Sequence, residues 1–344
     1  MNVDELREQV RARGLLPRAA PLVAMLSGGR DSVCLLDLAT AIRGADAVHA
    51  LHVNYGLRAD ADGDERHCRE LCRQLGVELE VVRAPPRPSD AGNLQAWARE
   101  LRYCEAERLA SRLDEGVVSR LGDPAARART RGGVLDEYNE PLAVTAIATG
   151  HTASDQVETI LYRLAASPGR RALLGMPARE GRLVRPLLEL MREQTADYCR
   201  ARRLSWREDS SNDDERYARA RVRHGLVPAL RAVHPAAEAN VLRTAQLLRA
   251  EAELLEELLD AELAGADGIA LERLARLPPA LARLLVIRLA EQAAGDFVPQ
   301  AGTRVSEILA LGRRGGRAEL HVGGLLRAVV ADGRLRMERL PPRD

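Results

Sequence analysis

Residues 21–32, with the sequence PLVAMLSGGRDS, decide the fold class. The apolar run of residues 21–26 predicts a short strand, and apolar residues at helical spacing after residue 32 predict a helix. The turn between them consists of Ser27, Gly28, Gly29, Arg30, Asp31 and Ser32. Glycines let backbone amides approach an anion, a helix N-terminus adds partial positive charge, and serine hydroxyls add donors. The stretch therefore predicts a strand, a phosphate-binding loop and a helix in succession.

Asp31 is the unusual residue of this loop. Its carboxylate would repel a phosphate unless a Mg²⁺ ion lies between the two groups, or unless the side chain caps the helix that follows. A Gly-Gly turn before a helix also occurs for structural reasons alone. The complete hexapeptide behind a strand favours a site for a metal-bound nucleotide.

The pattern of strand and helix continues on both sides of the loop. Apolar runs predict further strands at residues 48–53, 77–82 and 143–148, and helical spacing predicts helices at residues 60–75, 91–112 and 154–165. Such alternation predicts an α/β fold with a doubly wound, Rossmann-like parallel sheet.

The chain divides into three predicted parts. Residues 1–212 form the α/β domain, with a surface insertion near residues 114–141 that is rich in Gly, Arg and Asp. That insertion is either a solvated loop or a contact for RNA. Residues 213–300 are dominated by Leu, Ala, Arg and Glu and predict a helical domain. Residues 301–344 predict a small C-terminal segment, in which short alternating runs around Gly323–Gly324 and Asp332–Gly333 are consistent with a hairpin.

Composition excludes several kinds of chemistry. The formal net charge is only +1 and aromatic residues make up 3%, so neither a chain-wide basic surface nor rows of stacking rings is expected. All 51 basic residues are Arg. A Walker A loop, a Schiff-base enzyme and a nucleotidyl transferase of the DNA-ligase type each need a Lys, which this chain lacks.

The cysteines and the apolar runs indicate a compartment. The five cysteines show neither a CxxC pair nor zinc-ligand spacing, which indicates reduced thiols. The N-terminus is acidic, unlike a secretory signal, and no apolar run is long enough to span a membrane. We expect a soluble cytoplasmic protein without a membrane partner. The oligomeric state stays open, and a homodimer is one arrangement that the sequence allows.

A second polar cluster follows the strand predicted at residues 143–148. His151 and Asp155 are four residues apart and Glu158 lies one turn further, so a helix that begins near His151 would carry all three on one face at the carboxyl edge of the sheet. Ligands of open α/β sheets bind at that edge. The alternative is structural, with Thr152 or Ser154 capping the helix and Asp155 favouring its dipole.

Basic residues gather in the segment that follows. Residues 216–237 contain five Arg and two His and no acid, which fits a contact with a phosphate backbone. A solvated face offset by the acids of residues 213–215 is the alternative. Arg99 and Arg102 lie three apart on the helix predicted for residues 91–112 and could likewise contact phosphate or RNA.

Several motifs, in order, carry a resemblance to a known family. The loop SGGRDS resembles that of the PP-loop ATP pyrophosphatases, which cleave ATP between the α- and β-phosphates. The further matches resemble motifs of the tRNA(Ile)-lysidine synthetases and lie at residues 52–58, 92–103, 150–159, 185–188, 206–212 and 217–224.

This resemblance implies ATP and Mg²⁺ as cofactors, and as partners free L-lysine and an isoleucine tRNA with a CAU anticodon. It implies that the loop residues from Ser27 to Ser32 bind ATP together with His52 and Asn54. Asp31, His151, Asp155 and Glu158 would be catalytic, with Asp31 and Asp155 as metal ligands and Asp155 and Glu158 as candidates for the lysine ammonium group. The implied tRNA contacts are Arg99, Arg102, Arg185, Arg219, Arg221, Arg223 and His224.

The implied reaction joins lysine to C2 of the wobble cytidine through an adenylated base. Three features depart from the family pattern: Ser154 stands at the first position of a usual Asp pair, Ala220 replaces a usual Asn, and the 114–141 insertion lengthens a short connection. The first departure puts a second metal ligand in doubt, and the second puts one RNA contact in doubt. The alternative functions are a tRNA thiolation enzyme of the same class, a noncatalytic nucleotide- and RNA-binding module, and an ammonia-using amidating enzyme.

Overall fold

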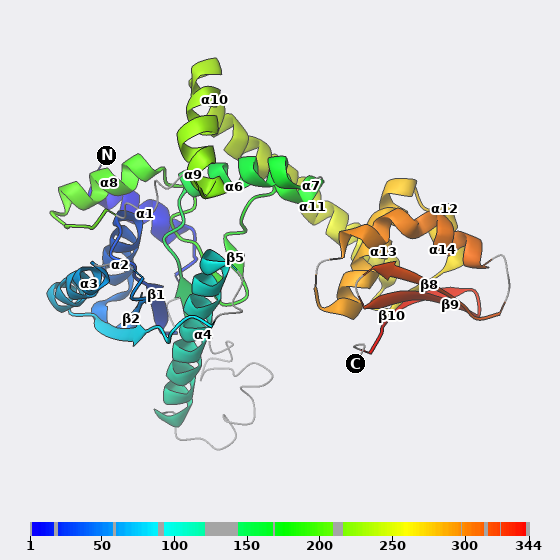
Figure 1. Ribbon diagram of the computed structural model, residues 1–344, viewed down its shortest axis with the longest axis horizontal. Coiled ribbons are helices and arrows are strands. Elements are labelled where there is room, and N and C mark those ends of the chain that lie inside the picture. Colours follow the sequence, from blue (N-terminus) through cyan, green and yellow to red (C-terminus); the bar gives the residue numbers. More distant parts are fainter. Residues whose placement is uncertain are drawn as a thin grey trace. The chain divides into compact units, whose positions relative to one another are not determined.

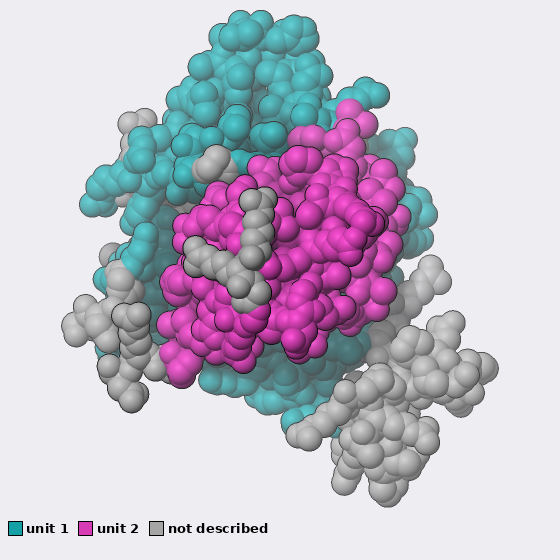
Figure 2. Space-filling model, turned by 90° about the vertical axis from the view of Figure 1, so that its right-hand side faces the viewer, with its two compact units in different colours: residues 1–246 teal, residues 247–344 magenta. Residues whose placement is uncertain are grey.

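The structure is a computed structural model, which describes residues 2–16, 20–57, 60–88, 93–120, 144–167, 169–208, 216–296, 298–312, 316–323 and 325–341. The chain divides into two compact units, Met1–Gln246 and Leu247–Asp344, which carry different colours in Figure 2. Each unit has a sheet of its own (Figure 1).

The sheet of the first unit has the strand order β3-β2-β1-β4-β6-β5. Its strands are β1 (Leu22–Met25), β2 (Val48–Asn54), β3 (Glu78–Arg83), β4 (Ala146–Ala148), β5 (Arg179–Glu180) and β6 (Leu183–Val184). All neighbouring strands pair in parallel except β5 and β6, which are antiparallel. The predicted doubly wound α/β fold is thus confirmed.

Strand β1 lies in the middle of this sheet and is buried on both faces. Leu22 and Ala24 belong to one core cluster with α1 (Val3–Ala12), α2 (Arg30–Arg43), α3 (Ala61–Leu75) and α8 (Arg192–Ala201). Val23 and Met25 belong to another, which α4 (Leu94–Arg120) covers. Alternate side chains of a strand point to opposite faces, so a continuous apolar run is what a strand between two helical layers requires.

Helix α4 runs further than the sequence indicated. The predicted end at residue 112 is wrong, since the helix continues to Arg120, and Asp114, expected at the start of the insertion, lies within it. Asp114 accepts hydrogen bonds from the Thr145 amide (2.9 Å) and hydroxyl (2.5 Å) and pairs with Arg182 (2.5 Å). These contacts fasten α4 to the strand edge beside β4. The remainder of the predicted insertion, residues 121–141, lies outside the described residues.

A helical region completes the first unit. It contains α6 (Ala153–Ala166), α7 (Arg170–Leu173), α9 (Ala218–Arg221), a π-helical turn at Val222–Leu226, α10 (Val227–Val233) and the part of α11 (Ala237–Leu263) up to Gln246. Val157 and Leu161 of α6 pack against Val222 and Val227. The basic segment is thereby attached to the helix that carries Asp155 and Glu158.

The second unit combines helices with an antiparallel sheet of strand order β7-β10-β9-β8. Its strands are β7 (Gly268–Ala270), β8 (Ala318–Gly323), β9 (Leu326–Ala331) and β10 (Arg334–Arg339), and its helices are α12 (Leu271–Arg276), α13 (Pro279–Ala294) and α14 (Val305–Gly312). Asp332 and Gly333 both have positive φ (51° and 70°) and join β9 to β10, as a two-residue hairpin turn requires. The expected hairpin is confirmed within this larger sheet.

The compact units do not coincide with the segments 1–212, 213–300 and 301–344 expected from composition. Helix α11 continues through residue 246, where the units meet, and β7 lies in the segment expected to be helical. Composition cannot detect a short strand such as β7, because its three residues pair with a strand more than sixty positions away. None of the helices in the described part of the chain is both long and apolar enough to cross a membrane.

Candidate active site

The loop after β1 is shaped by close contacts that only glycine tolerates. Gly28 has φ +83°, and a Cβ atom there would lie 3.3 Å from the Cys68 sulfur. The Ser27 and Ser32 hydroxyls lie 3.1 Å apart, and Ser32 donates to the Gly29 carbonyl oxygen (2.7 Å). Among the residues that the structure describes, no side chain caps the first amides of α2. The loop therefore leaves backbone donors at a helix N-terminus, where an anion binds favourably.

Asp31 lies in the first turn of α2 and is held by a residue far along the chain. The Thr195 hydroxyl, on α8, donates to Asp31 Oδ1 (2.5 Å), and Arg30 Nε donates to the same oxygen (3.1 Å). The Asp31 side chain is 22% exposed, whereas Thr195 is fully buried. The same hydroxyl lies 2.9 Å from the Arg192 carbonyl oxygen, so its single proton has two acceptors. The carboxylate is oriented yet still accessible.

The second motif meets the loop at the edge of the sheet. A Cβ atom on Gly150 would lie 2.9 Å from the Asp31 carbonyl carbon and oxygen and 3.0 Å from the Ser32 nitrogen. Glycine at position 150 is therefore required for the end of β4 to touch the start of α2. This contact brings residues 150–158 beside the nucleotide loop, as the predicted strand edges implied.

Asp155 and Glu158 form an ion-pair cluster with three arginines. Asp155 Oδ1 pairs with Arg219 (2.8 Å) and Arg192 (3.2 Å). Glu158 pairs with Arg223 (2.7 Å), Arg219 (2.9 Å) and Arg192 (3.3 Å). Both carboxylates are buried. We call these five residues the carboxylate–arginine cluster; three positive groups oppose two negative ones, so its formal charge is +1.

Asp155 also has the structural role that was left open. Its Oδ2 accepts from the Thr152 amide (2.8 Å) and hydroxyl (2.9 Å), which completes a capping box at the start of α6. Burial alone would raise the pKa of Asp155, but Arg219, the Thr152 amide and Arg192 outweigh burial and lower it. The carboxylate is therefore ionised and fully engaged.

His151 lies at the entrance to α6. Its Nδ1 is 2.8 Å from the Thr149 hydroxyl. Burial lowers the pKa of His151 to about 4; Asp155 opposes that shift, and Arg219 adds to it. The imidazole is therefore neutral at physiological pH, and it offers a hydrogen-bonding group beside the loop, without a positive charge.

His52 and Asn54 lie on β2, under the opposite flank of the loop. His52 is buried, and its Nδ1 lies 2.9 Å from the Leu26 carbonyl oxygen. Asn54 donates to Glu65 (3.0 Å) and Asp62 (3.1 Å) on α3, and it accepts from the Gly56 amide (3.0 Å). The Asn54 amide, with Arg69 and Arg83, lowers the pKa of Glu65 to about 2 in spite of burial. His52 therefore contacts the residue that leads into the loop, whereas Asn54 connects β2 to α3.

Three residues that sequence reasoning missed bind the site together. Arg192 and Thr195 lie in the first turn of α8, and the Arg192 amide also donates to Ser154 Oγ (3.1 Å). Arg207 donates its backbone N–H to the Gly28 carbonyl oxygen (3.0 Å), and its guanidinium pairs with Asp64 (2.5 Å) and Asp60 at the start of α3. Arg207 had a signal, because it follows Trp206 in a matched motif. Residues 209–212 of that motif lie outside the described residues.

The predicted tRNA contacts fall into three groups. Arg219 and Arg223 belong to the carboxylate–arginine cluster. Arg99, Arg102, Arg221 and His224 are exposed, and Arg99 stacks over the Tyr103 ring at 4.7 Å. Arg185 is only 3% exposed and bonds to the Pro177 carbonyl oxygen (2.6 Å) and Glu180 (3.0 Å). That burial favours a structural role for Arg185.

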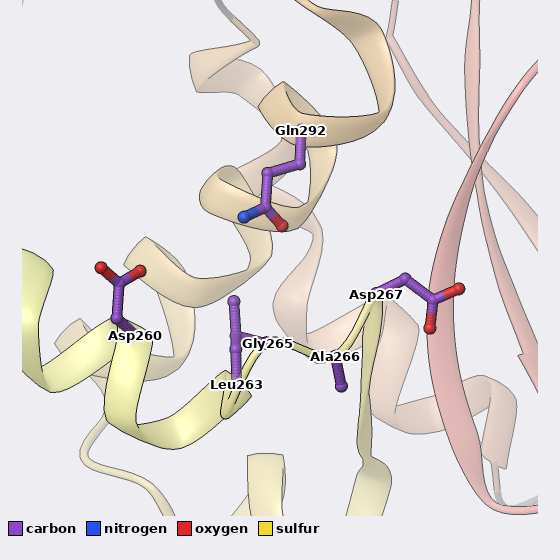
Figure 3. A pocket seen from close by; sticks show the side chains of 6 residues that line it. All are labelled: Asp260, Leu263, Gly265, Ala266, Asp267 and Gln292. Carbon is purple, nitrogen blue, oxygen red and sulfur yellow. The ribbon is translucent and has the colours of Figure 1, made fainter. Parts of the chain in front are cut away.

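A cavity of about 420 Å³ lies apart from this site, in the second unit. Figure 3 shows its two acidic residues, Asp260 and Asp267, on opposite sides. Asp260 pairs with Arg288 (2.9 Å) and Asp267 with Arg336 (3.6 Å). Its polar groups do not converge on one point, so the sheet edge of the first unit is the better candidate for chemistry.

Comparison with known proteins identifies the family. The sequence model of the PP-loop domain matches residues 5–120 and 114–230. The tRNA(Ile)-lysidine synthase of Gloeobacter violaceus is 36% identical over 298 residues, which cover 82% of this chain and 81% of that protein. The chain belongs to the tRNA(Ile)-lysidine synthase family.

Other relatives are longer than this chain. The tRNA(Ile)-lysidine synthase of Pseudomonas syringae pv. tomato is 35% identical over 248 residues, which cover 70% of this chain and 48% of that protein. The chain therefore spans about half the length of that relative. The U34-tRNA thiolase NcsA of Methanococcus maripaludis, at 14% identity and a TM-score of 0.50, covers 72% of this chain and 80% of its own. This likeness supports the fold alone.

Of the two residues predicted to bind Mg²⁺, Asp31 and Asp155, only Asp31 has surroundings that fit the ion. Asp31 is accessible and lies in the first turn of α2, and Mg²⁺ commonly takes one or two carboxylates with phosphate oxygens and water. Asp155 does not fit, because both of its oxygens are engaged and two guanidinium groups lie against Oδ1. No group of three or more His, Cys, Asp or Glu side chains suited to a metal occurs in the described ranges.

The thiols do not suit sulfur transfer in this family member. Cys34, Cys68, Cys72 and Cys199 are buried, and Cys104 is exposed on α4. Burial raises the pKa of Cys68 and raises that of Cys72 to about 12, and the hydrogen bond with Cys199 together with burial raises that of Cys34. A thiol must ionise to act as a nucleophile, so thiolation is not favoured.

Proposed function

We propose that this protein is a ligase that joins L-lysine to C2 of the wobble cytidine of an isoleucine tRNA with a CAU anticodon. It consumes ATP and yields lysidine, AMP and pyrophosphate. The observation that carries the proposal is the direct contact between the loop bearing Asp31 and the segment bearing His151, Asp155 and Glu158. That contact supports a site where a nucleotide and an amine substrate meet.

In the first step the C2 oxygen of the cytidine attacks the α-phosphorus of ATP, and pyrophosphate leaves. The loop amides and the Ser27 and Ser32 hydroxyls would hold phosphate oxygens at the start of α2. Asp31 would hold Mg²⁺, which neutralises the charge that develops on the phosphates. The Thr195 hydroxyl orients the Asp31 carboxylate, and so it would also fix the position of the Mg²⁺ ion. Most of the catalysis here is positioning.

In the second step the lysine ε-amine attacks C2 of the adenylated base, and AMP leaves. The carboxylates of Asp155 and Glu158 would hold lysine through an ammonium group. Arginines now occupy these carboxylates, so an arriving ammonium must replace at least one guanidinium. Neutral His151 lies next to this position and can accept a hydrogen bond from the ammonium group without adding a like charge.

The tRNA would contact the exposed basic residues around the site. Arg99 and Arg102 on α4, together with Arg221 and His224 in the helical region, are placed on the surface where a phosphate can reach them. The base must leave its stack to reach the loop, and an anticodon loop permits this at low cost. Arg219 and Arg223 would serve RNA only after they leave the carboxylates.

The test is lysine transfer by the purified protein. With ATP, Mg²⁺, radiolabelled lysine and an isoleucine tRNA transcript with a CAU anticodon, we expect label in the tRNA. Asp31→Asn should abolish the label, whereas the matched exposed acid variant Asp46→Asn should retain it. ATP cleavage that depends on a sulfur donor would instead favour the thiolation enzyme, and the absence of any cleavage would favour a noncatalytic binding module.

A further inference from the structure

A shallow cavity of about 350 Å³ lies beside the candidate active site, between α6 and residues 218–226. Its walls include Tyr162, Ala165, Ala166, Arg221, Val222 and Leu226. Tyr162 is 45% exposed and Leu226 is 41% exposed, so both large side chains are accessible to a ligand. We call this cavity the α6 pocket.

The chemistry of the α6 pocket suits a flat group attached to an anion. Three alanines, Ala165, Ala166 and Ala218, form a low wall, Tyr162 supplies an aromatic ring, and Arg221 supplies a planar cation. Unstacked bases of RNA bind on aromatic rings and on Arg guanidinium planes in this manner. The volume lies near the small end of ligand pockets, about 300–1,000 Å³, and so fits one planar group better than a large ligand.

The pocket adjoins the carboxylate–arginine cluster on two elements. Tyr162 follows Glu158 by four residues on α6, which places it on the same face and roughly 6 Å further along the axis. Arg221 lies between Arg219 and Arg223, both of which pair with Glu158. The α6 pocket therefore begins about one helical turn beyond Glu158 along α6.

We propose that the α6 pocket receives an unstacked base of the tRNA anticodon loop, from a nucleotide that neighbours the modified cytidine. This inference rests on the proposed function, because it takes tRNA as the substrate. The basic segment of residues 216–224, with four arginines and a histidine and no acid, supplies the charge complement to the phosphates of that nucleotide. The alternative occupant of the α6 pocket is a second copy of this chain.

The first experiment measures the binding of an anticodon stem-loop RNA in the absence of ATP and lysine. We expect Tyr162→Ala to weaken binding about tenfold, since loss of one stacking contact typically has this size. Tyr162→Phe should retain binding because the ring remains. Leu164→Ala is the matched control, because Leu164 is 58% exposed on α6 yet does not line the pocket.

The second experiment identifies the base. Single abasic substitutions are introduced at the loop positions on either side of the wobble cytidine. At one of these positions the abasic substitution should lower the affinity of the wild-type protein for the RNA. It should not lower the affinity of Tyr162→Ala any further, because the mutation and the abasic substitution remove the same contact. Thermal unfolding of each variant separates lost binding from lost folding, and Tyr162→Phe provides the folded reference.

Three results would overturn the inference. Unchanged RNA affinity of Tyr162→Ala would do so, as would abasic penalties that add fully to the mutation at every position. A fall in molar mass by light scattering with Tyr162→Ala would show that the pocket holds a second copy of the chain. Lysine transfer by the wild type is measured separately and tests the proposed function. Failure of the proposed function can therefore be told apart from failure of the inference about the α6 pocket.

Discussion

At the scale of single residues, the site depends on side chains that orient other side chains. Thr195 is fully buried and has a polar hydroxyl directed at Asp31. A hydrogen bond to a charged group contributes about 1.5–3 kcal/mol, which is large enough to be seen in kinetics. Sequence spacing could not predict this pair, because the two residues are 164 positions apart.

Replacement of Thr195 tests this orientation. Thr195→Val keeps the shape and removes the hydroxyl, so we expect kcat for lysine transfer to fall about tenfold, with a higher Mg²⁺ requirement. Thr195→Ser keeps the hydroxyl and should stay close to the wild type. Equal loss in both variants would mean that packing at this position matters and the hydrogen bond does not.

His151 gives a pH dependence with a definite sign. Its folded pKa of about 4 lies below the ordinary value of 6.5, so folding favours the neutral ring. The resulting stabilisation is complete above pH 6.5 and is lost as the pH falls toward 4. We therefore expect the free energy of unfolding to decline over this window, measured by urea unfolding. His151→Gln should remove that part of the decline, and an unchanged profile would contradict the burial argument.

At the scale of elements, the first turn of α8 and the segment after it hold the loop in place. Arg192 and Thr195 reach α6 and α2, and Arg207 reaches the loop and α3. The strands and the loop could be predicted because apolar alternation and glycine chemistry are local properties. These clamps could not, since each depends on elements that meet only in the folded chain.

Arg207 should matter for ATP more than for tRNA. Arg207→Ala removes the guanidinium that pairs with Asp64 and Asp60 and leaves the backbone bond to Gly28. We expect KM for ATP to rise about fivefold, the equivalent of about 1 kcal/mol for a partly exposed pair. The control is Arg73→Ala, which breaks an exposed pair with Glu70 on the same α3 helix. An unchanged KM for ATP would remove Arg207 from the site.

Glu158 tests the proposed place of lysine. Glu158→Gln removes the negative charge that pairs with Arg192, Arg219 and Arg223. We expect KM for lysine to rise at least about tenfold, because a buried ionic contact is lost, with a lower melting temperature for the same reason. Glu180→Gln, which changes an exposed acid, is the control. A lower melting temperature with an unchanged KM for lysine would leave Glu158 with a structural role only.

At the scale of the whole molecule, local patterns predicted the fold class but not the division of the chain. The doubly wound sheet and the terminal hairpin followed from periodicity and turn residues. The four-stranded sheet of the second unit did not, because β7 is three residues long and its partner β10 follows it by more than sixty positions along the chain. One residue can also belong to a structural motif and to the candidate site, since Asp155 completes the capping box of α6 and lies in the segment beside the loop.

We propose that one site adenylates a cytidine and then exchanges the adenylate for lysine. Mass analysis of the nucleosides of the reacted tRNA, with AMP and pyrophosphate counted in the same reaction, tests both steps. We expect the wobble cytidine to gain the mass of lysine less one water, with one AMP and one pyrophosphate per modified nucleotide. An unmodified cytidine, or a mass gain of sulfur in place of oxygen, would contradict it.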